Sequence, residues 1–247
     1  MPCLSCGAPN TIDAHLIPKA FIAEVKVDPG ERHLILHGGK TSPIRSHTGI
    51  YDRDILCGTC DALLGDHEGY AVELLRECRA AEGPPRGIIT FEPVDGDRLI
   101  RFAAGIAWKY AVTGQAGRID IGPYVGVLAD VALRRAAIPD TLDLAMMRIV
   151  ELDGDVYFYR TPMPDRKEGV NMVRFTVGSF LIFLKIDKRR PGSLLPPECW
   201  LRGRTAGAFV MTPAELVEEG RLHRALASSE PSRNFFRAMR AGQARRQ

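Results

Sequence analysis

The chain has 247 residues, of which 45% are hydrophobic, and its formal net charge is +3. A chain of this size can bury a sizeable core without disulfide cross-links. Its longest apolar run, FTVGSFLIFLKI, is shorter than the roughly 18 residues that a membrane span needs, and its N-terminus lacks the basic and then apolar order of a signal peptide. We therefore expect a cytoplasmic protein with no membrane partner, and the oligomeric state stays open.

The charge is unevenly distributed along the chain. Residues 1–92 carry 9 Lys and Arg against 13 Asp and Glu, whereas residues 93–247 carry 24 against 17. An anionic partner would therefore meet the second part more favourably than the first.

Two cysteine pairs of the form C-x-x-C dominate the first part, at Cys3 and Cys6 and at Cys57 and Cys60. In a reducing compartment such pairs are more economically interpreted as metal ligands than as disulfides. Four thiolates satisfy tetrahedral zinc with no open position, which is typical of a structural site. The sequence therefore predicts structural zinc at these four residues, with a redox dithiol as the alternative.

The two pairs are further apart than the roughly 15 to 20 residues of a compact zinc ribbon. The chain between them must therefore form structure of its own and bring the second pair back to the first. We expect a β-hairpin between the pairs and a helix opening at Cys60, the ββα arrangement called a treble clef. Residues 1–85 would form this zinc-bound domain, which ends near the Pro- and Gly-rich segment EGPPRG.

Residues 86–247 are expected to form a second, mixed α+β domain. Apolar spacing predicts one helix within 96–114 and another over 124–137. The Asp-Gly pair at 153–154 is typical of a hairpin turn, and 171–187 is rich in β-branched and aromatic residues. The sequence therefore predicts a small antiparallel sheet, and the fold class is α+β.

The last part of the chain is expected to be helical and basic. Thr212 is followed three residues later by Glu215, a spacing that resembles the capping box of a helix start. Seven arginines follow from Arg221 onward against one acid, Glu230. Such a helix could bind phosphates without sequence preference, or it could be a solvated face that packs its Phe pair, 235–236, on the body of the protein.

The motifs AHLIPKAF and LCGTCDALLGDHEGYA resemble those of the HNH, or His-Me finger, endonucleases. In the zinc-stabilised branch of that family, a strand ending in a histidine follows the first knuckle, and a second C-x-x-C opens a helix. The chain is still more similar to a group of bacterial proteins with SHIIPKF before LLCxxCE and a later helix containing a Trp-Lys or Trp-Arg pair, which IAWKYAV matches here. The resemblance covers roughly residues 1 to 80.

This resemblance implies a metal-dependent endonuclease that hydrolyses the phosphodiester bonds of nucleic acid, with DNA as the expected form. His15 would activate water, because an imidazole with a pKa near 6.5 suits a general base. Asp61 would help to hold Mg²⁺ or another divalent cation that neutralises charge on the scissile phosphate. The four cysteines would then be scaffolding that fixes the strand relative to the helix.

The chain departs from the family pattern at several positions. Ala14 stands where an acidic residue usually precedes the histidine, and Asp13 would have to replace it. The central Asn of the pattern is matched only approximately, by Asp52 or Asp54. Asp61 replaces an Asn or His, and it could equally be an ordinary helix-capping residue.

Two alternatives therefore stay open beside the nuclease. The first is a catalytically degenerate zinc module that binds nucleic acid or a protein, in which His15 only bonds to the backbone. The second is a structural zinc knuckle that serves a C-terminal domain with its own ligand. His67 and Glu68 are more simply interpreted as solvated helix residues than as metal ligands.

Overall fold

The computed structural model describes residues 1–24, 33–37, 44–81, 83–150, 158–193 and 195–228. The turn expected at 153–154 lies outside the described residues. The same holds for the part of the basic tail after residue 228.

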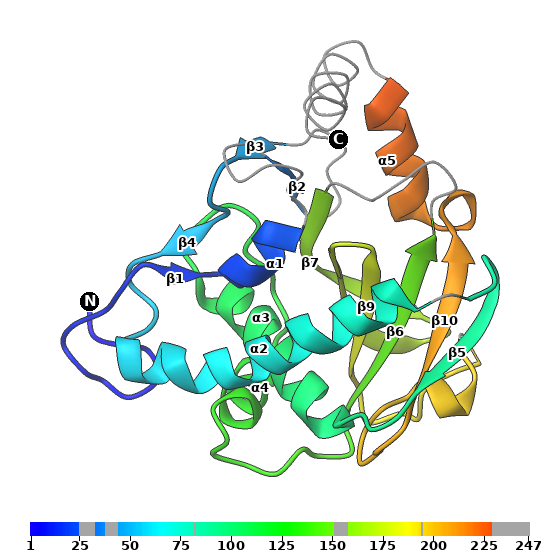
Figure 1. Ribbon diagram of the computed structural model, residues 1–247. Helices are drawn as coiled ribbons and strands as arrows, with labels where there is room; N and C mark the ends of the chain where they lie inside the picture. Colours follow the sequence, from blue (N-terminus) through cyan, green and yellow to red (C-terminus); the bar gives the residue numbers. More distant parts are fainter. Residues whose placement is uncertain (25–32, 38–43, 82, 151–157, 194, 229–247) are drawn as a thin grey trace.

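The described part of the first half of the chain holds short strands, the short helix α1 and three longer helices, α2, α3 and α4 (Figure 1). In chain order its elements are β1 (Ala14–His15), α1 (Lys19–Glu24), β2 (His33–Leu36), β3 (Ile44–Ser46), β4 (Tyr51–Asp52), α2 (Gly58–Ala80), β5 (Gly87–Phe91), α3 (Gly96–Val112) and α4 (Tyr124–Ala132).

The second half is mostly β-structure. Its elements are β6 (Leu142–Val150), β7 (Phe158–Lys167), β8 (Val170–Val177), β9 (Phe180–Ile186), the 3-10 turn η1 (Pro197–Cys199), β10 (Gly207–Pro213), the 3-10 turn η2 (Ala214–Leu216) and α5 (Glu218–Ser228). The helix expected to begin at Thr212 is a wrong prediction, because that residue lies in β10 and α5 begins only at Glu218.

A mixed sheet of eight strands, in the order β3-β2-β7-β8-β9-β6-β10-β5, forms the centre of the molecule. Most neighbours are antiparallel, but β2 with β7 and β10 with β6 are parallel. The prediction of a mixed α+β fold is confirmed, whereas the prediction of a small antiparallel sheet is wrong. Strands from both parts of the chain form this sheet, because β2 pairs with β7 and β5 pairs with β10, and both partners are distant in sequence.

Helices cover one face of the sheet (Figure 1). Helix α3 lies against β6, β7 and β9, and α2 and α4 pack on α3. Nearly all of α3 is buried, from Leu99 to Ala111 except for one half-buried arginine. This central position makes α3 the element that connects the sheet to the N-terminal cysteine pairs.

The two faces of the sheet carry separate apolar clusters, as the alternation of side chains along a strand requires. In β6, Leu144 and Met146 join the larger cluster under the helices, whereas Ala145 joins a smaller one on the opposite face. The smaller cluster also contains Cys199, which ends η1, and Trp200, which follows it. The long sheet is therefore covered on both sides.

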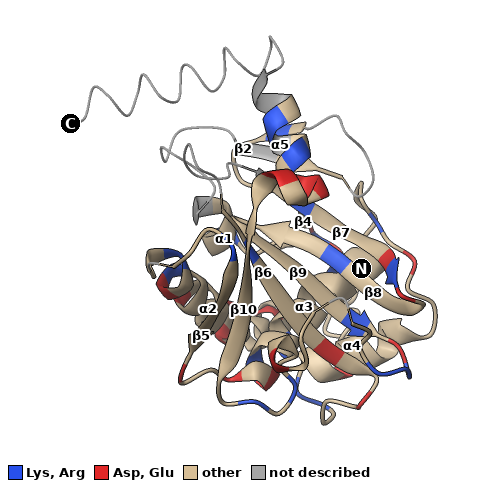
Figure 2. Cartoon of the chain, turned by 90° about the vertical axis from the view of Figure 1, so that its right-hand side faces the viewer, with Lys and Arg blue, Asp and Glu red and all other residues tan. Residues whose placement is uncertain are grey.

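A buried group of charges joins the sheet to α5. Arg160 of β7 donates to Glu219 (2.9 Å) and Glu218 (3.1 Å), and Arg174 of β8 donates to Glu218 (2.8 Å). Arg160 and Glu219 are both almost completely buried. Figure 2 shows the acidic residues at the start of α5 above basic positions of the sheet strands. Among the described residues, no helix is both long and apolar enough to cross a membrane.

Candidate metal centre and the histidine beside it

The four cysteines of the two pairs meet in space. Their sulfur atoms all lie within 4.8 Å of one another, and the Sγ atoms of Cys6 and Cys57 are 3.6 Å apart. Tetrahedral zinc with bonds of about 2.3 Å places its sulfur ligands roughly 3.8 Å apart. The residues present therefore fit a metal ion such as zinc, and the expected meeting of the two cysteine pairs is confirmed, whereas bound zinc stays a prediction.

Backbone hydrogen bonds hold the two cysteine pairs together. Leu4 donates its N–H to the Ile55 carbonyl (3.0 Å), and Ile12 donates to that of Leu56 (2.9 Å). The first pair lies in a turn closed by a bond from the Gly7 N–H to the Cys3 carbonyl (2.8 Å). The second pair opens α2, so the cluster fixes the chain before β1 against the first turn of that helix.

The sulfur cluster has uneven proton affinities. Burial alone would raise the pKa of Cys3, but hydrogen bonds from the backbone around both pairs lower it to about 6. Burial raises the pKa of Cys60 to about 12, and the neighbouring sulfurs add to this. Backbone donors thus already stabilise one thiolate, and a bound cation would stabilise the others, because metal binding requires deprotonated sulfur.

His15 ends β1, which pairs with β4 so that His15 lies opposite Tyr51. Their ring centroids are 6.0 Å apart. The side chain is half-buried, and its Nε2 atom is buried without a hydrogen-bond partner. Desolvation and the charge of Lys109 lower the pKa of His15, while a hydrogen bond with the backbone of Thr48 acts in the opposite direction. The imidazole is therefore neutral at neutral pH.

Lys109 of α3 contacts the backbone of this histidine. Its Nζ donates to the carbonyl oxygen of His15 (2.7 Å) and to Oε1 of Glu68 on α2 (2.9 Å). The lysine side chain is 1% exposed. A buried ammonium group needs such partners, so Lys109 links β1, α2 and α3 at one point.

Asp61 lies in the first turn of α2, directly after Cys60, and it is half-buried. Its charge raises the pKa of His15, although less than the other influences on that ring. Asp61 is not the N-cap, since α2 begins after Cys57 and that end has no side-chain cap. Strand and helix thus bring an imidazole and a carboxylate within electrostatic reach of each other.

The other acidic residues near His15 are already engaged. Asp13 accepts from Nε of Arg53 (2.7 Å) in an exposed ion pair. Asp52 is buried and accepts from the Thr113 hydroxyl (2.5 Å), the Gly114 N–H (3.0 Å) and the Asp54 N–H (2.9 Å). Asp52 therefore connects β4 to the end of α3, and its carboxylate oxygens are satisfied by protein donors.

A shallow depression of about 440 Å³ lies along β4 and includes the carboxylates of Asp52 and Asp54 and the side chain of Gln115. His15 is not among the residues that line it. The imidazole of His15 therefore does not line this acidic depression along β4.

The interpretation of His67 and Glu68 as solvated residues is wrong. His67 is buried and its Nε2 accepts from Nε of Arg134 (3.1 Å), and burial, followed by the charge of Arg134, lowers its pKa to about 4. Glu68 is the partner of Lys109. Lys109 itself was missed as a site residue, and the only signal for it was one lysine within an otherwise apolar helical stretch.

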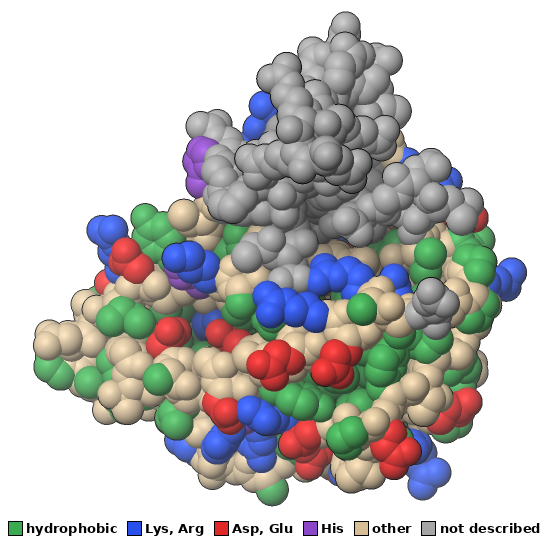
Figure 3. Space-filling view, viewed as in Figure 1, with side chains coloured by type: hydrophobic (Ala, Val, Ile, Leu, Met, Phe, Trp, Pro, Cys, Tyr) green, Lys and Arg blue, Asp and Glu red, His purple; other side chains and the backbone are tan. Residues whose placement is uncertain are grey.

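Helix α2 carries five acidic residues against two arginines, and the face seen in Figure 3 shows both acidic and basic side chains. Asp66 forms ion pairs with Arg98 and Arg134, and Glu68 forms one with Lys109. Basic partners thus neutralise two of the acidic residues of α2.

Comparison with known proteins identifies no relative: no family model, no curated protein and no solved structure matches this chain.

Proposed function

We propose that the chain is a metal-dependent endonuclease whose N-terminal part, residues 1–85, is a zinc-bound treble clef. In this proposal zinc at the four cysteines fixes β1 relative to α2. His15 takes the proton of an attacking water, and Asp61 helps to hold Mg²⁺ or another divalent cation beside the scissile phosphate of DNA.

One observation carries the proposal: a neutral imidazole with an unpartnered ring nitrogen stands within electrostatic reach of a carboxylate, and both are held by the cysteine cluster. A general base must be unprotonated at the working pH. The lowered pKa of His15 meets this requirement.

His15 has a defined support in this proposal. Lys109 acts through the backbone carbonyl of His15 and through its charge, so it is a positioning residue and not a catalytic one. Glu68 neutralises the buried ammonium group and keeps it in place. Lys109 and Glu68 would together position His15, and the charge of Lys109 would favour the unprotonated ring.

The test is cleavage of plasmid DNA and of RNA with added Mg²⁺, Mn²⁺ or Ni²⁺, comparing the unmodified protein with His15→Ala. His47→Ala is the matched control, because His47 is an exposed histidine of the same segment. We expect metal-dependent cleavage that His15→Ala lowers at least a hundredfold and His47→Ala leaves intact, in line with the usual contribution of a general base. Equal background activity in all three proteins would remove the enzyme.

A noncatalytic module that binds nucleic acid or protein is the second candidate function. Ala14 favours it, because the usual acidic ligand is missing, and so does the burial of Nε2, because water must reach that atom. A salt titration of DNA binding separates its two forms: affinity that falls steeply with salt indicates contacts to phosphate. No DNA affinity at low salt would leave a protein partner.

A further inference from the structure

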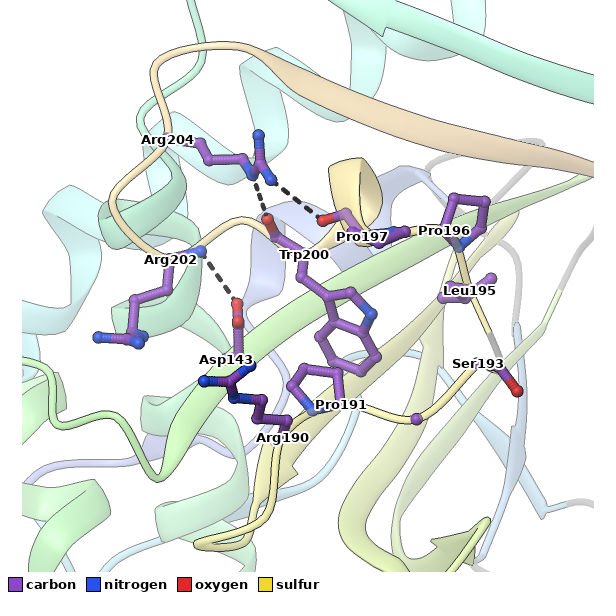
Figure 4. Close-up of a pocket in the computed structure, with 11 residues that line it drawn as sticks. Asp143, Arg190, Pro191, Ser193, Leu195, Pro196, Pro197, Trp200, Arg202 and Arg204 are labelled. Carbon is purple, nitrogen blue, oxygen red and sulfur yellow. Dashed lines mark hydrogen bonds between the residues drawn. The ribbon is translucent and has the colours of Figure 1, made fainter.

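The largest cavity among those described lies far from the cysteine cluster. It has a volume of about 630 Å³ and is formed by the segment after β9 together with the segment that leads from η1 into β10 (Figure 4). This volume falls within the roughly 300–1,000 Å³ of small-molecule sites. No residue of the cysteine cluster, and neither His15 nor Asp61, lines it.

The cavity and the His15 site lie at opposite ends of α3. The start of α3 is joined to the cavity segment by a bond from the Gly203 N–H to the carboxylate of Asp97 (2.7 Å), whereas Lys109 near its end bonds to His15. With a rise of 1.5 Å per residue, the 12 residues between these two positions span about 18 Å. The cavity is therefore a separate site.

Apolar groups form the centre of the cavity. Figure 4 shows the indole of Trp200 in the middle, with Pro191 below it and Pro197 above. Leu195 closes one side. The indole is 5% exposed, and its Nε1 atom is buried without a hydrogen-bond partner. A flat, largely apolar ligand body fits beside these apolar groups.

Three arginines line the cavity beside these apolar groups, against one carboxylate, that of Asp143. Arg204 is held in place, because its Nε donates to the Trp200 carbonyl (2.7 Å) and its Nη2 to the Pro197 carbonyl (3.1 Å). The carboxylate of Asp143 accepts from the backbone N–H of Arg202 (2.9 Å) and so fixes the chain that carries this arginine.

The guanidinium groups of Arg190 and Arg202 have no ion-pair partner among the described residues, and both residues are exposed. Asp143 already accepts two backbone N–H groups on one oxygen, from Leu144 and Arg202. The lining thus has more positive than negative charge and keeps guanidinium groups available. Guanidinium groups bind phosphate through paired hydrogen bonds.

We infer that this cavity binds an aromatic phosphate monoester, the chemistry of a mononucleotide. Its ring would lie beside Trp200 and the prolines, and its phosphate dianion would meet Arg190 and Arg202. A ligand phosphate, which carries two negative charges, matches two available guanidinium groups better than a ligand with a single carboxylate does. The site does not depend on nuclease activity, and it would persist if His15 proved noncatalytic.

The test is binding of adenosine monophosphate and of phenyl phosphate to the full chain, measured by calorimetry and by indole fluorescence. The chain has two tryptophans, and the other, Trp108, is buried in the helical layer. Trp200→Phe should therefore remove the fluorescence response. Adenosine and inorganic phosphate, each lacking one half of the ligand, should bind at least tenfold more weakly than adenosine monophosphate.

The double variant Arg190→Gln, Arg202→Gln should lose affinity for both phosphate esters at least tenfold. Its matched control is Lys188→Gln, Arg221→Gln, which removes the same charge from exposed positions outside the cavity and should bind as the unmodified protein does. Failure of both esters to bind, or equal affinity in the two double variants, would overturn the inference. Neither result bears on cleavage by His15, so the two proposals fail separately.

Discussion

The cysteine module and the eight-stranded sheet are stabilised in different ways. The module has two strands of two residues each, β1 and β4, and its geometry depends on four sulfur atoms. The sheet has strands of up to ten residues and apolar clusters on both faces. Apolar residues of the module, among them Leu16, Ile55 and Leu56, also join the larger apolar cluster, so metal ligands would add to the shared core and not replace it.

The largest effect is expected from removal of the metal ligands. Cys57→Ser, or chelation, should abolish the bound metal, which we expect at one ion per chain, and should unfold the module, because structural zinc contributes about 10 kcal/mol in small domains. Hydrogen exchange should accelerate in β1, β4 and the start of α2, while β8 and β9 stay protected. Cys78→Ala, a buried cysteine of α2 outside the cluster, is the control and should keep its metal. Simultaneous loss of protection in the sheet would contradict this separation.

The buried ion pair between Arg160 of β7 and Glu219 of α5 tests what stabilises the sheet. Glu219→Ala leaves Arg160 buried with one less partner, which should lower the free energy of unfolding by about 3 to 5 kcal/mol. Glu215→Ala removes an exposed pair with Arg224 and should cost less than about 1 kcal/mol. Denaturant unfolding measures both. Equal effects of the two variants would show that burial of Arg160 and Glu219 does not matter.

A pH effect should arise at His67, where α2 contacts the segment after α4. Its pKa in the folded protein is about 4, below the ordinary 6.5 of the unfolded chain, so protonation favours unfolding. This stabilisation is complete above pH 6.5 and is lost as the pH falls toward 4. We expect the unmodified protein to lose about 3 kcal/mol more than His67→Gln over this range. Parallel stability curves for the two proteins would refute a buried neutral His67.

The smallest effect is expected at the surface of the module. Asp13→Ala breaks the exposed ion pair with Arg53 and should leave the stability nearly unchanged, because solvent screens such a pair. It should also leave any metal-dependent cleavage unchanged, because Asp13 is engaged by Arg53 and is not needed as a cation ligand. A hundredfold loss of cleavage in this variant would instead identify Asp13 as the substitute for the residue missing at Ala14.

Local patterns predicted several helices well. Helix α2 was expected from its apolar spacing and from the segment EGPPRG, and α3 begins where Asp95 caps it by accepting from the Arg98 N–H. Helix α4 ends at Ala132 and not near 137. Soon after that end Arg134 has a φ of 59° and bonds to His67 of α2. The early end of α4, which the local sequence did not indicate, is thus accompanied by a contact with α2.

The candidate site was predictable only in part. The cysteines and His15 stand in recognisable motifs, and nothing yet tests their roles in catalysis. The bond from Lys109 to His15 joins residues 94 positions apart, and the cavity at Trp200 combines segments that carry no motif. The division of the chain at 85 and 86 also stays a prediction, although β2 and β3 of the first part pair into the large sheet.

By itself the sequence determined the four sulfur ligands and the longer helices, because ligand type, tight C-x-x-C spacing and apolar periodicity are local properties. Only the tertiary structure decided the order of the eight strands, the burial of Arg160, Lys109 and His67, and the separation of the cavity from His15. These features depend on which distant segments share a core, and pairing energies between distant segments leave no periodic signal in the chain.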